Sequence, residues 1–512
     1  MLVAASLLIA GTTSDAGKTV VVTALCRAFA RRGLKVAPFK AQNMSNNSMV
    51  VAGADGTGEI GRAQWIQAVA AQASPEPAMN PVLLKPGGDR RSHVVVMGQP
   101  AGSVSSRDFA DGRAHLADAA FAAYDDLASR YDVVICEGAG SPTEINLRAS
   151  DYVNMGLARH ADMPVVVVGD IDRGGVFAAL YGTLALLEAA DQQLLAGFVL
   201  NKFRGDASLL TPGLRELESL TGRTMLGVMP WHPDLWLDSE DGLAVPAVSA
   251  TGLTAATLGG TSHGAARAPV RVAVIRLPRI SNFTDVDALG LEPDVYLEFV
   301  TEPRDLAGAH LVVVPGTRAT LDDLAWLRAR GLDQALATHV ERGGSVLGIC
   351  GGFQMLGREI SDPDGIEGDP GTVVYGLGLL DATTRFAAEK ILRLPTGQAL
   401  GQDVSGYEIH HGRVTVHDDD EFLGGARRDR VFGTMWHGSL ESDDFRSAVL
   451  AEVARASGEE RAASGVSFAA AREARLDLLA DLAEEHLDLD ALLELAQTGA
   501  PEMPVLPPGA TR

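Results

Sequence analysis

Two separate stretches of the chain carry residue types and spacings that can do chemistry. The first is glycine-rich, Gly11-Thr-Thr-Ser-Asp-Ala-Gly17-Lys18-Thr19, and it lies between an apolar run and a predicted helix over 20–32. Backbone N–H groups of such a loop, with the N-terminus of the next helix, form a cradle for phosphate. Lys18 would then reach the terminal phosphates of ATP, and the Thr19 hydroxyl would ligate Mg²⁺.

Two later apolar runs end in polar residues that belong with such a loop. Glu137 ends the run Asp132-Val-Val-Ile-Cys-Glu137, and the end of such a strand lies beside a phosphate loop. Glu137 is therefore predicted as a second Mg²⁺ ligand, with an ordinary strand-end glutamate as the alternative. Asn201 follows another apolar run. Its amide both donates and accepts, so it could read a purine edge, or it could simply cap the strand.

The second stretch centres on a cysteine between glycines. Ser345-Val-Leu-Gly-Ile-Cys350-Gly-Gly-Phe-Gln-Met-Leu356 reads as a strand, a sharp turn and a helix. Small residues on both sides of Cys350 allow a strained turn that exposes its thiol, and the N-terminus of the following helix favours the thiolate. An oxyanion would be met by backbone N–H groups, one from Gly351 and one from the turn that ends at Thr317. A structural cysteine is the alternative.

The elements that must position these residues alternate between short apolar runs and helix-like stretches. Unbroken runs of Val, Ile and Leu indicate strands buried on both faces, hence parallel sheets covered by helices. The fold class is α/β with two parallel-sheet domains, the first a P-loop NTPase-like domain. The predicted strands are 3–9, 35–39, 132–136, 164–168, 197–200 and 225–228 in the first domain, and 270–275, 311–316 and 345–350 in the second.

The domain boundaries follow changes in composition. A phosphate-loop domain, which the resemblance described below implies to be an ATP-dependent synthetase, is predicted over 1–240 and a second domain over 270–451. They are joined by a linker over 241–269 in which Gly, Ala, Ser and Thr dominate. Residues 452–512 are predicted as a C-terminal extension, with a helical hairpin over about 467–497 and a disordered tail over the last dozen residues, 501–512, which include four prolines.

Charge and cysteine usage exclude several classes of protein. The chain has 512 residues, and its 43 basic and 66 acidic residues leave a formal charge of −23. Binding to nucleic acid or to an anionic membrane needs a positive field, so neither is expected as a partner. Three cysteines are too few for a disulfide framework and fit a cytoplasmic location. The apolar N-terminus runs straight into the phosphate loop, which favours a buried strand over a signal peptide.

Several longer segments resemble one family, the cobyric acid synthases. The loop spacing is one residue longer than the general phosphate-loop pattern and is similar to that of dethiobiotin synthetase, which these enzymes resemble. The matches extend from residue 11 to about 446. They include 40–48 (KAQNMSNNS), 58–64 (GEIGRAQ), 79–86 (MNPVLLKP), 137–147 (EGAGSPTEINL), 169–175 (GDIDRGG), 315–320 (PGTRAT), 406–410 (GYEIH) and the Cys350 loop.

This resemblance implies four ATP-dependent amidations of adenosylcobyrinic acid a,c-diamide, at carboxylates b, d, e and g. The nitrogen would come from glutamine, and the reaction would belong to cobalamin synthesis. At the phosphate loop, Lys40 would approach the phosphates beside Lys18. Glu59, expected to open a helix, would be a further Mg²⁺ ligand, with Asp55 as the competing candidate.

The Cys350 loop resembles class I glutamine amidotransferases, so the second domain is expected to have that fold. In these enzymes the thiolate attacks the glutamine amide and releases ammonia from a glutamyl thioester. The segment 433–446 resembles the family's catalytic-histidine segment, which assigns His437. Most class I enzymes carry Glu two residues later, where this chain has Ser439. The centre is therefore either a cysteine–histidine dyad or has an orienting group from elsewhere, with Glu441 one possibility.

Two alternatives compete with this interpretation. Cobyrinic acid a,c-diamide synthase has similar two-domain chemistry, but the segment 41–48 favours cobyric acid synthase. A partitioning-type regulatory ATPase has a similar phosphate loop. Such an ATPase carries an additional lysine near the start of the loop, where this chain has Thr12 and Thr13, and it lacks an amidotransferase domain. The oligomeric state is left open.

Overall fold

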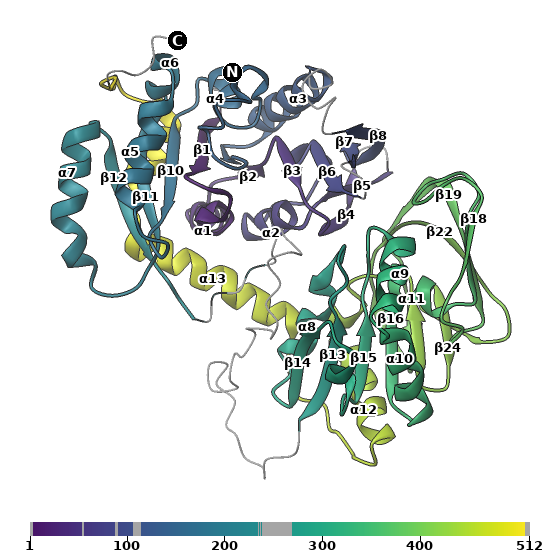
Figure 1. Cartoon of the computed structure of the whole chain (residues 1–512). Coiled ribbons are helices and arrows are strands. Elements are labelled where there is room, and N and C mark those ends of the chain that lie inside the picture. The colour runs from purple at the N-terminus through teal and green to yellow at the C-terminus, as the bar shows by residue number, and fades with distance from the viewer. Residues whose placement is uncertain are drawn as a thin grey trace.

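Figure 1 shows the computed structural model, which describes residues 4–53, 56–87, 91–105, 114–233, 235, 237 and 269–506. Apart from residue 269, the predicted linker over 241–269 lies outside the described residues. The chain forms two α/β domains, each built on a largely parallel sheet, as the sequence predicts. No helix in these ranges is long and apolar enough to cross a membrane.

The first domain is built on a six-stranded sheet in which every pairing is parallel. In sheet order its strands are β12 (Thr224–Pro230), β11 (Leu195–Phe203), β10 (Val165–Asp170), β1 (Ala5–Gly11), β9 (Val133–Glu137) and β2 (Val36–Phe39). All six predicted strands are confirmed. Ile9 of β1 pairs with Glu137 of β9, so the phosphate loop and the carboxylate emerge at the same edge.

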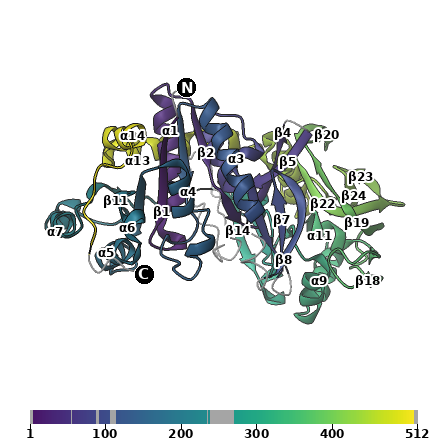
Figure 2. The ribbon, with the colours of Figure 1, turned by 90° about the horizontal axis from the view of Figure 1, so that it is seen from above.

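Helices cover both faces of this sheet (Figures 1 and 2). The predicted helix after the phosphate loop is confirmed as α1, although it begins two residues earlier than expected. The helices are α1 (Lys18–Arg31), α2 (Arg62–Ala70), α3 (Ala114–Arg130), α4 (Met155–Ala161), α5 (Val176–Leu186), α6 (Ala189–Gln192) and α7 (Thr211–Thr221).

A second group of strands in this domain lies on the side of the second domain and was not predicted. Its sheet order is β3 (Gln42–Met44), β6 (Val82–Pro86), β7 (Arg91–Val96) and β8 (Gln99–Ser105), with a separate hairpin of β4 (Ser48–Gly53) and β5 (Gly56–Gly61). The expectation that Glu59 opens a helix is wrong: Glu59 lies on β5, and α2 begins at Arg62.

The second domain has a seven-stranded sheet whose central strands are parallel. Its order is β14 (Val295–Val300), β13 (Val270–Ile275), β15 (Leu311–Val314), β16 (Ser345–Ile349), β25 (Val431–Thr434), and the antiparallel β24 (Gly425–Arg428) and β23 (Asp420–Phe422). A four-stranded sheet adjoins it: β18 (Thr372–Tyr375), β17 (Glu359–Asp362), β19 (Ala382–Arg393) and β22 (Glu408–Val416), with the hairpin β20 (Thr396–Ala399) and β21 (Gln402–Ser405). The helices are α8 (Asp287–Gly290), α9 (Thr320–Ala329), α10 (Leu332–Glu341), α11 (Gly351–Leu356) and α12 (Asp443–Ala456).

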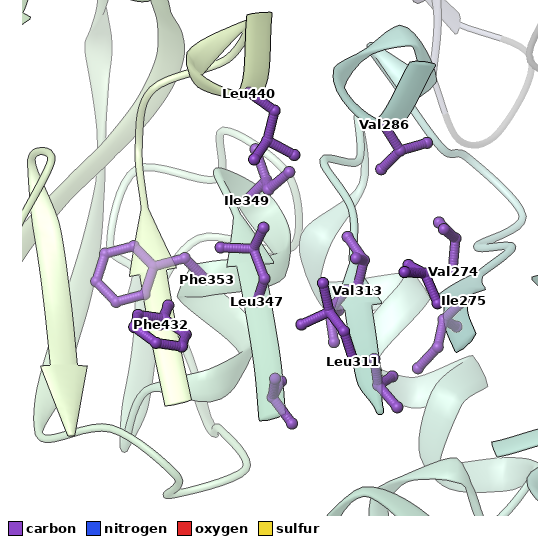
Figure 3. Packing of buried hydrophobic residues seen from close by; sticks show 14 of the residues in the cluster. Val274, Ile275, Val286, Leu311, Val313, Leu347, Ile349, Phe353, Phe432 and Leu440 are labelled. Atoms are coloured by element: carbon purple, nitrogen blue, oxygen red, sulfur yellow. The ribbon is translucent and has the colours of Figure 1, made fainter. Parts of the chain in front are cut away.

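The core of this domain fixes the strand ends that carry chemistry. Leu347 and Ile349 of β16 are buried beside Val313 of β15, as Figure 3 shows. Val286, in the segment after β13, and Leu440, in the segment after β25, are both 1% exposed and belong to the same cluster. Because these side chains are buried in one close-packed cluster, the neighbouring residues have little freedom to move.

The last two helices return to the first domain. α13 (Phe468–His486) and α14 (Leu489–Thr498) form the predicted hairpin. Leu476 and Leu479 lie in one hydrophobic cluster with Leu25 and Phe29 of α1. Figure 1 shows α13 running from the second domain along the first. The hairpin therefore completes the core of the first domain and is not a separate extension.

Part of the predicted disordered tail is ordered in the structure. Met503 and Leu506 are each 9% exposed. Gln193 donates to the Met503 carbonyl over 2.6 Å, and the Leu506 N–H donates to Gln192 over 2.8 Å. The prediction of disorder is thus wrong for residues 501–506, whereas 507–512 lie outside the described residues.

Candidate active sites

The phosphate loop turns sharply at Gly17 before α1 begins. Gly17 has φ 94°, and a Cβ there would lie 1.9 Å from the Asn201 amide nitrogen, so only glycine fits. The Lys18 ammonium is directed back over the loop, where it donates at 3.0–3.3 Å to the carbonyls of Thr13, Ser14 and Gly140. The structure thus gathers a lysine and the helix N-terminus around one loop, the arrangement that binds phosphate.

Asn201 lies beside the phosphate loop and contacts the loop's backbone. Its side-chain N–H donates to the Ala16 carbonyl over 3.0 Å, and the residue is only 3% exposed. This contact holds the loop in shape. A contact between Asn201 and a purine stays a prediction.

Glu137 is the centre of a buried polar network at the end of β9. The Thr19 hydroxyl and the Lys40 ammonium donate to one carboxylate oxygen over 3.0 and 2.8 Å, and Gln67 donates to the other over 2.5 Å. Burial alone raises the pKa of Glu137, but the positive charges of Lys40 and Lys18 outweigh it and lower the pKa. The carboxylate is therefore ionised. Gln67 was not predicted, because a helical glutamine carries no sequence signal of its own.

The donor set around Glu137 fits Mg²⁺. A threonine hydroxyl and an ionised carboxylate are hard oxygen ligands, and Mg²⁺ is usually held by one or two carboxylates together with substrate phosphates. No group of three or more His, Cys, Asp or Glu residues in the described ranges could hold a metal by itself. Thr19 and Glu137 are thus the residues suited to share the ion with a nucleotide.

Glu59 is not brought to this network. The Ser48 hydroxyl and the Lys85 ammonium donate to one of its oxygens over 2.9 and 2.5 Å, and Lys390 of the second domain donates to the other. Burial raises the pKa of Glu59, but the two lysines outweigh it and hold the pKa well below its usual range. The structure therefore places Glu59 in an ion-pair cluster between the domains. The competing candidate, Asp55, lies outside the described residues.

The sharp turn predicted between a strand and a helix is present at Cys350. β16 ends at Ile349, and Cys350 has φ 51° and ψ −110° before α11 begins. A Cβ at Gly348 would lie 2.8 Å from the Phe353 backbone, and one at Gly352 would lie 1.9 Å from the Val314 carbonyl oxygen. Both flanking glycines are thus required by close backbone approach, as the sequence indicates.

His437 lies against Cys350 and has a carboxylate partner on its other side. The His437 Nδ1 atom is 2.7 Å from the Asp285 carboxylate, which also accepts from the Gly438 N–H over 2.8 Å. Burial lowers the pKa of His437, but the charges of Asp285 and Cys350 outweigh it and raise the pKa to about 10. The geometry is a Cys–His–Asp triad whose imidazole is held as imidazolium.

The sequence did not identify Asp285, which lies 152 residues before His437. It is carried by a short helix over Phe283–Val286, between β13 and α8. The alternative orienting group, Glu441, is used elsewhere. Its two oxygens pair over 2.8 Å with Arg62 and with Arg472, which ties the domains together.

The predicted oxyanion donors lie together beside the nucleophile. A Cβ built on Gly351 would be 3.2 Å from the Thr317 backbone nitrogen, and one on Gly316 would be 2.9 Å from the His437 ring. The Thr317 hydroxyl donates to Asp323 over 2.5 Å, which fixes the turn. The Cys350 turn, the turn at Gly316–Thr317 and the His437 imidazole therefore lie close together.

A cavity of about 40 Å³ opens at this point and is lined by Cys350, Gly351, Thr317 and His437. His410 and His411 also line it. A larger cavity of about 730 Å³ lies between the domains. Five residues line both cavities: Lys85, Arg318, Glu367, Lys390 and His411.

These features define a class: a nucleotide-binding domain joined to a glutamine amidotransferase domain. Family models agree with it. Residues 7–245 match the CobQ/CobB/MinD/ParA nucleotide binding domain. Residues 271–445 match the CobB/CobQ-like glutamine amidotransferase domain.

Comparison with curated proteins identifies the family. The cobyric acid synthases of Mycolicibacterium gilvum (strain PYR-GCK) and Mycobacterium marinum (strain ATCC BAA-535 / M) are each 66% identical to this chain over 507 residues, covering 98% of this chain and 99% of each relative. That of Mycobacterium tuberculosis (strain ATCC 25177 / H37Ra) is 64% identical over 509 residues, with the same coverage. The chain belongs to the cobyric acid synthase family.

Proposed function

We propose that this protein amidates carboxylates b, d, e and g of adenosylcobyrinic acid a,c-diamide, with ATP to activate each carboxylate and glutamine to supply the nitrogen. The observation that carries the proposal is identity of 64–66% to cobyric acid synthases over 98% of the chain, a span that includes both sites. A regulatory ATPase is disfavoured, because these relatives match the amidotransferase domain as well.

At the first site the residues bind and orient the nucleotide. The loop N–H groups and Lys18 would hold the phosphates, while Lys40 would add a second positive charge beside the transferring group. Thr19 and Glu137 would hold Mg²⁺, which when bound neutralises charge on the terminal phosphates. An acceptor carboxylate oxygen attacks the terminal phosphorus, and ADP leaves with the electron pair. The product is an acyl phosphate.

At the second site the residues release ammonia from glutamine. The Cys350 thiolate attacks the side-chain amide carbon, and the N–H groups of Gly351 and Thr317 would stabilise the resulting oxyanion. His437, oriented by Asp285, gives its proton to the leaving nitrogen, so ammonia departs and a thioester remains. Water then hydrolyses the thioester to glutamate.

The two products meet in an amide bond. Ammonia attacks the acyl carbon, inorganic phosphate leaves, and the amide forms. The cavity at Cys350 and the larger cavity between the domains share lining residues from both domains, Lys85 from the first among them, and this supports an exit for ammonia toward the first domain.

Mass spectrometry tests the proposal directly. The protein is incubated with adenosylcobyrinic acid a,c-diamide, ATP, Mg²⁺ and glutamine, and addition of four amide groups is expected. A diamide synthase would instead leave this substrate unchanged and, in a parallel incubation with cobyrinic acid, would add amide groups only at a and c.

A further inference from the structure

The segment that carries Asp285 is clasped by the nucleotide-binding domain. Asn282 accepts a hydrogen bond from the Ser48 N–H over 3.1 Å and donates to the Ser48 carbonyl over 3.2 Å. The Thr284 hydroxyl donates to the side-chain oxygen of Asn47 over 3.3 Å. Three hydrogen bonds thus join Asn47 and Ser48, where β4 of the first domain begins, to the few residues before Asp285.

Asn282 also contacts the other partner of the catalytic imidazole. Its side-chain nitrogen donates to the Tyr407 hydroxyl over 3.0 Å. The Tyr407 ring stacks on His437 with centroids 5.3 Å apart and an interplanar angle of 24°. The main chains of Tyr407 and His437 exchange two further hydrogen bonds of 3.0 and 2.9 Å. The Asn282 side chain therefore links Ser48 to Tyr407, one of the two neighbours of His437.

The burial and backbone conformation of Asn282 suit an asparagine at this position. It is 1% exposed and has φ 50°, a left-handed conformation that asparagine tolerates better than most residues. The helix over Phe283–Val286 has only four residues, and the Asp285 N–H donates to the Asn282 carbonyl over 3.0 Å. An element this short has little stability of its own, so its position depends on tertiary contacts.

Ser48 connects Asn282 to the ion-pair cluster between the domains, which contains Glu59, Lys85 and Lys390. Its backbone holds Asn282, while its hydroxyl donates to Glu59 and accepts from Lys85 over 2.9 Å in each case. Lys390 of the second domain closes the same cluster. Buried charges are costly unless their partners stay in place, so the cluster favours one docked arrangement of the domains.

We propose that Asn282 is a positioning residue of the glutaminase centre, which makes the centre competent only while the second domain is docked on Ser48 of the first. Docked, Asn282 holds Asp285 and Tyr407 against His437. Released from Ser48, the short helix loses its fixed position and the imidazole loses its orientation. This inference rests on the proposed glutaminase activity and adds that the nucleotide-binding domain completes it.

The test is Asn282→Ala in the full-length chain, with glutamine and ammonium compared as nitrogen donors. We expect kcat with glutamine to fall about tenfold or more, because small misplacements of catalytic groups cost that much. The KM for glutamine should change less than kcat, and amidation with ammonium should keep the wild-type rate. The alkaline limb of the glutaminase pH profile should move to lower pH as Asp285 loses its hold on His437.

Two further variants make the result decisive. Tyr407→Phe removes only the hydroxyl that Asn282 contacts, so it should show a smaller loss of the same kind, and it decides the question if Asn282→Ala does not fold. Thr57→Val is the matched control. It removes another hydrogen bond between the domains, from Thr57 to the Leu392 carbonyl over 2.7 Å, and should leave glutamine-dependent turnover unchanged.

An unchanged kcat with glutamine in both Asn282→Ala and Tyr407→Phe would overturn the inference. So would an equal loss in Thr57→Val, since docking in general, and not this clasp, would then be responsible. Failure of the proposed function is distinguishable, because the wild-type chain would then form no corrinoid amide with either nitrogen donor.

Discussion

Asp285 completes a Cys–His–Asp triad, where the sequence alone predicted a cysteine–histidine pair. Its removal should shift the pH dependence of glutamine hydrolysis in a definite direction. Its carboxylate raises the pKa of His437 to about 10, so the imidazolium persists well above neutral pH. In Asp285→Asn that charge is lost, the pKa of His437 falls, and the alkaline limb of glutamine hydrolysis should move to lower pH. We expect kcat to fall about tenfold or more. A pH–rate profile for glutamate release checks both, and Ser439→Ala, which keeps the carboxylate, should retain the wild-type profile.

Cys350 is the residue whose loss should separate the two activities. Alanine cannot form the thioester, so Cys350→Ala should release no glutamate from glutamine. The first domain does not need the thiol to activate a carboxylate, so high concentrations of ammonium should restore amidation. Glutamate release and corrinoid amide formation are measured side by side. Glutamine use at the wild-type rate would remove Cys350 from the mechanism.

Lys18 should behave in the opposite way. Its ammonium lies over the phosphate loop, where no other side chain of the loop supplies a positive charge. Lys18→Ala should therefore abolish amide formation with glutamine and with ammonium alike, because phosphoryl transfer fails. Phosphate release and amide formation are the readouts. Full ligase activity with ammonium would exclude the loop from catalysis.

At the scale of elements, α13 is as much a part of the first domain as α1. Arg27 of α1 pairs with Glu473 and Asp477 over 2.7 and 2.9 Å, and Leu479 is fully buried between these elements. Leu479→Ala should lower the free energy of unfolding of the first domain by about 2–5 kcal/mol. Hydrogen exchange followed by mass spectrometry should show lost protection in α1 and β1 but not in β15 and β16. Equal loss in both sheets would mean that the domains unfold as one unit.

The elements that could be predicted from the sequence are those with an unbroken apolar signal. β10 reads Val165-Val-Val-Val168 and can only be a strand buried on both faces. β3 and β5 lack such a signal: Gln42-Asn-Met44 is mostly polar, and Gly56-Thr-Gly-Glu-Ile-Gly61 is half glycine. They are strands because of tertiary pairing. Since the sequence of β5 carries no strand signal, Glu59 was expected on a helix.

At the scale of the whole molecule, the sequence predicts residues that sit in a local pattern and misses those that meet only through folding. The local pattern identifies Cys350, Lys18 and Glu137, because each lies at a strand end or in a glycine loop whose adjacent residues indicate its role. Asp285 and Asn282 have no such neighbours, since their partners come from another part of the sheet or from the other domain. The packing of the C-terminal hairpin on the first domain was not predicted for the same reason. Helical spacing predicts which face of a helix is buried, but it does not predict which surface that face packs against.

The return of α13 and α14 to the first domain has a consequence for how the nascent chain matures. All six strands of the first sheet have been synthesised once residue 230 is made, but the helix that covers α1 ends at His486. At about 5–20 residues per second, synthesis takes roughly 10 to 50 seconds to reach that point. During this interval the amidotransferase domain can fold, while the apolar face of α1 stays uncovered and available to chaperones. A gene cut after the amidotransferase domain would therefore yield a protein whose defect lies at the opposite end of the chain.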